Sequence, residues 1–179
     1  MKTFLRYYVE LPFPLREVDR AIAQLPAEWL NIAARDAYVR AALMLATQTG
    51  EEVGLGAADV SVSLAASSLV DGILSRSIRW LAAGLDQPLL HGDLELAELG
   101  PCRTQIALSA QHLSFPRVSP CTSRAGSQRI GESTLKAFVD RMASYVEDVL
   151  GSRQSAIPRN QRAVAPSASS LPHCWVAAP

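Results

Sequence analysis

Apolar and polar residues alternate in several stretches of this chain, and period-two alternation predicts β-strands with one buried face. The first such stretch, residues 3–11 with the sequence TFLRYYVEL, is rich in aromatic and β-branched residues and is ended by Pro12. The pattern returns at residues 60–65, 75–83, 90–99 and 104–113. Because these later stretches follow one another with short connections, they predict an antiparallel meander.

Other stretches repeat their apolar residues at three- and four-residue steps, the spacing of one helical face. Residues 15–25 and 27–34 predict two short helices after the first strand, with Pro26 ending the first of them. Residues 38–47, YVRAALMLAT, fit either a helix or a strand. Their position beside the other strands favours a strand.

The longest helical pattern lies at residues 129–150. Its apolar stripe consists of Ile130, Leu135, Phe138, Met142, Tyr145, Val146 and Val149. The opposite face is charged, and Glu132 and Lys136 on that face form a favourable pair at i,i+4. Gly151 is expected to end the helix. Such an amphipathic helix needs an apolar surface to lie on, and the predicted sheet is the obvious partner.

The predicted order of elements is a strand, two short helices, antiparallel strands and one long helix, which indicates an α+β domain. A curved antiparallel sheet can wrap around the closing helix and leave a hollow between the two. We expect residues 1–150 to form this domain. Residues 151–179 are rich in Ser, Pro and Ala without periodicity, so a disordered tail is predicted there.

The charges of the chain balance, with 17 basic and 17 acidic residues. The charged residues after position 150 are all basic (Arg153, Arg159 and Arg162), which leaves 14 basic against 17 acidic groups in residues 1–150. A mildly acidic body argues against a nucleic-acid surface, which would need clustered Lys and Arg. No apolar run approaches the roughly 18 residues of a membrane span. The three cysteines are odd in number and widely spaced, which favours a reducing, cytoplasmic setting over a disulfide framework.

Residues 91–116, HGDLELAELGPCRTQIALSAQHLSFP, combine an acidic-apolar strand, a Leu-Gly-Pro turn and a strand that begins with Thr. Together with the shorter stretches IRWLAAG, AEWLNIA and ESTLKAFVDRMA, they resemble bacterial members of the START-like, polyketide-cyclase-like helix-grip superfamily. The resemblance covers residues 3–150 and implies a cavity between sheet and helix that takes a small hydrophobic molecule. The stretch RVSPCTSRAGS at residues 117–127 departs from the group, in which this loop tends to be apolar and rich in Gly and Pro.

The side chains that would line this cavity follow from the inward parity of the strands and from the helix stripe. They are Val62, Trp80, Leu94 and Leu108 from the sheet, and Phe138 and Met142 from the helix. Trp80 would offer a flat wall and one N–H donor, and Met142 would adapt to varied ligands. His112 falls on the inward parity near the end of its strand, where it would orient a ligand at the mouth of the cavity. All of these positions also fit a filled core, and the histidine also fits a contact with solvent or a backbone carbonyl.

No catalytic signature accompanies these residues. The chain has no GxSxG sequence, its GLG fragment at residues 54–56 lacks the third glycine of a dinucleotide site, and no His or Cys pair has the spacing of metal ligands. No cofactor or metal is therefore expected. A cyclase or dehydratase would need a buried acid–base group, for which His112, with Arg79 or Tyr7, is the candidate. The resemblance favours binding of a small hydrophobic molecule, with a cyclase or dehydratase and an interaction module with a filled core as alternatives.

Overall fold

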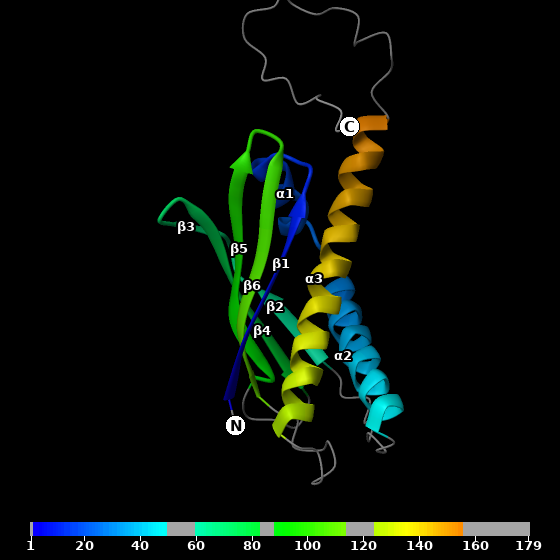
Figure 1. Ribbon diagram of the computed structural model, residues 1–179. Coiled ribbons are helices and arrows are strands. Elements are labelled where there is room, and N and C mark those ends of the chain that lie inside the picture. The colour runs from blue at the N-terminus through cyan, green and yellow to red at the C-terminus, as the bar shows by residue number, and fades with distance from the viewer. Residues whose placement is uncertain (1, 50–59, 83–87, 114–123, 156–179) are drawn as a thin grey trace, which may run out of the picture.

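The computed structural model describes residues 2–49, 60–82, 88–113 and 124–155. In chain order the elements are β1 (Lys2–Leu11), α1 (Leu15–Ala23), α2 (Ala27–Thr49), β2 (Val60–Leu64), β3 (Ser68–Val70), β4 (Ile73–Ala82), β5 (Leu90–Gly100), β6 (Arg103–Leu113) and α3 (Arg124–Ser155). Figure 1 shows the sheet with α3 running along it and α2 beside α3. The predicted α+β fold is confirmed: a curved antiparallel sheet packs against a long C-terminal helix, as in the helix-grip fold.

All strands pair antiparallel in the order β1-β6-β5-β4-β2, and the short β3 pairs with β4. The consecutive strands β4, β5 and β6 form the expected meander, and β1 lies at the edge beside β6. Strand β3 joins β4 through Asp71 and Gly72, whose φ angles of 51° and 80° are those of a tight hairpin turn. With three residues, β3 is too short to show an alternating pattern, and the sequence does not predict it.

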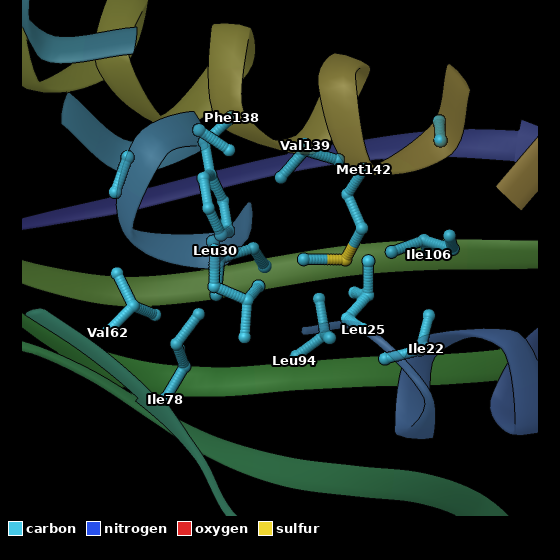
Figure 2. Packing of buried hydrophobic residues seen from close by; sticks show 14 of the residues in the cluster. Ile22, Leu25, Leu30, Val62, Ile78, Leu94, Ile106, Phe138, Val139 and Met142 are labelled. Carbon is cyan, nitrogen blue, oxygen red and sulfur yellow. The ribbon is translucent and has the colours of Figure 1, made fainter. Parts of the chain in front are cut away.

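The inward face of the sheet and the three helices enclose one hydrophobic core. Strand β5 follows the expected alternation: Leu90, Leu94 and Leu96 are buried, whereas His91 and Asp93 face solvent. Figure 2 shows the middle of this core, where side chains of α3 lie over those of the sheet. Burial of this apolar surface is the main force that holds the helices on the sheet.

A buried arginine fastens α1 to the sheet. Arg76 lies on β4, and its guanidinium binds the Asp19 carboxylate of α1 at 2.6 Å and the backbone oxygen of Ala65 at 3.3 Å. A buried cation needs such partners because an unpaired charge in the core is strongly destabilising. The two charged residues are 57 positions apart, and nothing in the sequence pattern predicts their contact.

The second helix is longer than expected, and the strand expected at residues 38–47 is wrong. This stretch forms the C-terminal half of α2, which has 23 residues. Its alanines explain the difference. Ala41 and Ala42 are buried, and alanine both favours helix and allows α2 to lie close to α3.

The closing helix also extends beyond its expected end. Gly151 lies inside α3 and does not take the positive φ by which a glycine ends a helix. The hydroxyl of Ser152 donates to the backbone oxygen of Asp148, one turn earlier, at 2.6 Å. Residues 151–155, expected as the start of a tail, are therefore helical. The other residues of that expected tail, 156–179, lie outside the described part of the structure.

Candidate functional site

The side chains expected to line a cavity converge in the core between the sheet and α3. Val62, Trp80, Leu94, Leu108, Phe138 and Met142 are all at most 7% exposed and belong to one hydrophobic cluster. The rings of Trp80 and Phe138 meet edge to face, with centroids 4.9 Å apart and an interplanar angle of 68°. Phe138 and Met142 point from α3 toward the sheet (Figure 2). The structure brings the six residues together, and their binding of a ligand stays a prediction.

His112 occupies a register position beside this cluster. Its backbone pairs with Thr3 of β1 and with Leu90 of β5, and Leu90 in turn pairs with Trp80 of β4. The histidine side chain lies outside the described part of the structure, as does the loop at residues 114–123. Its expected role at a cavity mouth therefore stays a prediction as well.

Two small residues, Gly92 and Ala110, occupy the inward face of the sheet where β5 and β6 pair. Gly92 lies opposite Ile78 of β4 and Ala110 of β6. A Cβ atom at Gly92 would lie 2.1 Å from the backbone oxygen of Ser109 and 2.5 Å from the Cα of Ala110, so a glycine is required for this close approach. Because Gly92 and Ala110 have little or no side chain, the inward face of the sheet is recessed there. We call this recess the floor of the core site, and it lies beside the row of paired residues that contains Trp80.

Two polar atoms in this core have no hydrogen-bond partner. The indole Nε1 of Trp80 and the hydroxyl Oγ1 of Thr134 are both buried and bond to no atom of the described residues. Thr134 lies on α3 one turn before Phe138, whose ring contacts Trp80. An unsatisfied buried polar group costs about 1–3 kcal/mol, and for that reason nearly all such groups in folded proteins are paired. A polar atom of a bound molecule that reached either group would therefore be stabilised there.

Thr134 is the residue of the site that the sequence analysis misses. It lies four residues after Ile130 and four before Phe138, on the same stripe of α3. Side chains four residues apart share one helical face, so this spacing places Thr134 between Ile130, which packs on α2, and Phe138, which packs on the sheet. A hydroxyl on an otherwise apolar stripe is a candidate for a specific contact.

Two of the candidate acid–base residues, Tyr7 and Arg79, do not meet, and the side chain of the third, His112, lies outside the described part of the structure. The Tyr7 hydroxyl, on β1, donates to Asp140 Oδ1 at 2.8 Å and accepts from Lys136 Nζ at 2.8 Å, so it ties the edge strand to α3. Hydrogen bonds to Asp140 and Tyr7 raise the pKa of Lys136 above its usual value, which keeps its ammonium form. Arg79 is exposed on the outward face of β4, and two strands separate it from β1. Residues 2–49, 60–82, 88–113 and 124–155 hold no cluster of three or more potential metal-ligating side chains.

The expected pair of Glu132 with Lys136 is not formed. Lys136 instead pairs with Asp140, with Nζ 2.8 Å from Oδ2. Glu132 accepts a hydrogen bond from Gln128 Nε2 at 2.8 Å, one turn earlier. The Tyr7 hydroxyl explains the choice, because Lys136 can reach Asp140 and Tyr7 at the same time.

A second hollow lies on the outer side of the helices, between α2 and α3. This groove has a volume of about 690 Å³ and is lined by Asp36, Ala37, Arg40, Ala41 and Met44 of α2 and by Ser133, Lys136, Ala137, Asp140, Arg141 and Ser144 of α3. An ion pair crosses it, with Arg141 Nη1 2.6 Å from Asp36 Oδ2. Small side chains on both helices form its floor, and charged side chains form its rim.

Two observations bear on the setting of the protein. No helix in the described ranges is long and apolar enough to cross a membrane. Cys102, in the turn between β5 and β6, is disulfide-bonded. The cysteine pattern therefore gives no support to a reducing setting, and the cytoplasmic location stays a prediction.

Comparisons with known proteins find no matching family model and no matching curated protein. Among solved structures, a hypothetical protein from Helicobacter pylori matches 80% of this chain and 88% of its own, with a TM-score of 0.45 and 12% identity. A protein from Thermus thermophilus matches 82% of this chain and 99% of its own, with a TM-score of 0.41 and 11% identity. The Zhui aromatase/cyclase from a Streptomyces strain matches 89% and 98%, with a TM-score of 0.33 and 12% identity. Similarity at this level assigns neither a family nor an activity.

Proposed function

We propose that this protein binds a small, mainly apolar molecule between the sheet and α3, and that Trp80 and Thr134 bond to a polar atom of that molecule. The observation that supports the proposal most directly is a pair of buried polar atoms without partners in the described residues: Nε1 of Trp80, whose ring contacts Phe138, and Oγ1 of Thr134, one turn earlier on α3. A ligand that supplies an acceptor there removes the cost of leaving those atoms unsatisfied. The low floor at Gly92 and Ala110 lies in the adjacent row of the sheet.

The two groups also restrict the chemistry of the ligand. An indole N–H is a donor only, and a threonine hydroxyl both donates and accepts, so a carbonyl or hydroxyl oxygen satisfies both. The ligand should be neutral, because a charge brought into this core needs a partner. Arg76 is the buried cation of the described core, and Asp19 and Ala65 already occupy its donors.

Binding requires side chains of α3 to move. Phe138 and Met142 have no exposed surface, so the cluster is closed in the ligand-free chain. Met142 has three rotatable bonds and a polarisable sulfur, which lets it repack around an inserted molecule at low cost. The ring of Phe138 contacts Trp80, and its displacement would uncover the indole N–H.

The first test compares two buried threonines. Prodan, a neutral naphthyl ketone whose emission reports its surroundings, should bind the parent protein saturably at one-to-one stoichiometry. Thr134→Val should weaken this binding about three- to tenfold, the effect of one hydrogen bond. The same change should raise the melting temperature of the free protein, because it removes an unsatisfied hydroxyl.

Thr104→Val is the matched control. The Thr104 hydroxyl is buried like that of Thr134, but it donates to the backbone oxygen of Phe13 at 2.8 Å. Its loss should lower the melting temperature and leave the affinity for prodan unchanged. A parent protein that shows no saturable binding, or a Thr134→Val variant with parental affinity, would refute the proposal.

The closed packing of the core also favours the alternative of an interaction module with a filled interior. Leu108→Trp separates the two. If the core opens for a ligand, the larger side chain takes up that space, weakens prodan binding and costs little stability. If the core is rigidly filled, overpacking should cost about 1–3 kcal/mol. A strongly destabilised Leu108→Trp variant, together with no probe binding to the parent, would favour the interaction module.

A further inference from the structure

We propose that the groove between α2 and α3 is a second binding site, for a small amphiphile with one carboxylate, and that Arg40 binds the carboxylate. The groove lies on the outer side of the helices, away from the core site. Figure 1 shows α2 lying alongside the N-terminal half of α3, which forms the two walls. Its volume of about 690 Å³ is within the range of small-molecule sites.

The charges of the groove leave one cation without a partner. Asp36 is paired with Arg141 at 2.6 Å, and Asp140 is paired with Lys136 at 2.8 Å. Arg40 is exposed and has no ion pair or side-chain hydrogen bond with the described residues. The five charged side chains therefore sum to one positive charge, which is located on Arg40. A guanidinium presents two parallel N–H donors that match a carboxylate.

Apolar side chains lie on both sides of Arg40, among the charged ones. Ala37, Ala41 and Ala137 form a floor of small side chains between the helices, and Met44 is 51% exposed at one end. Another hollow, of about 430 Å³, continues from the groove along α2 and shares Asp36, Arg40 and Met44 with it. It exposes Leu43 at 48%. Arg40 thus lines both hollows, in which small and apolar side chains lie beside charged ones, and a ligand with one anionic end and a short aliphatic chain matches this pattern.

The groove and the core site lie on opposite sides of the same helix. Lys136 and Ala137 line the groove, whereas the ring of Phe138 is buried against Trp80 of the sheet. The chain has three methionines, and Met44 lies in the groove while Met142 lies in the core site. Each site therefore contains its own methyl group for NMR.

The test follows the methionine methyl signals of protein labelled with ¹³C at the methyl carbon while decanoate is added below its micelle concentration. Decanoate should shift the Met44 signal saturably and leave Met142 in place. Arg40→Gln should weaken this binding about tenfold, the effect of losing a charge-assisted contact. Arg16→Gln, which removes an exposed arginine of α1 outside the groove, is the matched control and should leave the affinity unchanged.

Three results would overturn the proposal. Decanoate that leaves Met44 unshifted shows that the groove does not bind it. Equal affinities for the parent and Arg40→Gln, or equal shifts with the neutral decanol, show that Arg40 does not recognise the carboxylate. Thr134→Val should not alter decanoate binding, so failure of the core site and failure of the groove site are distinguishable.

Discussion

Replacing Gly92 with alanine tests the close approach of β5 and β6 that makes the floor of the core site. The added Cβ would lie 2.1 Å from the backbone oxygen of Ser109, where ordinary contacts begin at 3.4 Å, so it is more than an ångström too close. The other two near atoms are the Cα and Cβ of Ala110, at 2.5 and 2.7 Å, and neither belongs to a flexible side chain that could relieve the overlap. The two strands must therefore move apart in the middle of the sheet. We expect a loss near the upper end of the overpacking range, about 3 kcal/mol.

A loss of this size lowers the melting temperature by about 6–12 °C, because 1 kcal/mol shifts a chain of this length by roughly 2–4 °C. Calorimetry and urea unfolding both measure it. Gly151→Ala is the matched control: a Cβ there meets nothing within 4 Å, and alanine in a helix gains about 0.5–1 kcal/mol over glycine. A Gly92→Ala variant that melts with the parent would show that the strands tolerate the side chain and that the glycine is not needed for their approach.

Three further changes test the packing. Arg76→Met leaves Asp19 unpaired and should lower the free energy of unfolding by about 3 kcal/mol, which urea unfolding measures. This is the lower end of the range for a broken buried pair, because 24% of the Asp19 side chain is exposed. Phe138→Asp should prevent soluble folding while Lys136→Asp changes the unfolding midpoint little, and equal midpoints would contradict the burial of this face. Burial raises the pKa of Tyr38 from 10.0 to about 12, so the unfolded chain loses this proton first. Stability should then fall as the pH rises from 10 toward 12, and Tyr38→Phe should flatten that slope in pH-dependent melting.

The alternation of the strands is predictable because one face of the sheet is buried and the other is wet, as in β5. The second half of α2 lacks this contrast between faces. It buries small alanines such as Ala41 and exposes large apolar residues, among them Leu43 at 48% and Met44 at 51%. Hydrophobic periodicity therefore gives the wrong element there, and the helix propensity of alanine is the better guide. The groove proposed to bind a carboxylate has the same origin: the small residues of α2 are buried and leave room, and its large apolar residues are exposed and line the groove.

Parity and helical spacing select the inward side chains of the core, but they do not determine whether a polar atom among them finds a partner. Lys136 has two acidic residues within one turn, Glu132 and Asp140, and the hydroxyl of Tyr7, more than a hundred positions away, decides between them. Among the described residues the same kind of distant contact is absent for Thr134, whose buried hydroxyl has no hydrogen-bond partner. Only the three-dimensional structure therefore reveals that this hydroxyl lacks a hydrogen-bond partner. A paired hydroxyl on this stripe would stabilise the fold, whereas the unpaired one lowers stability, and that cost is reversed only when a polar partner enters the core.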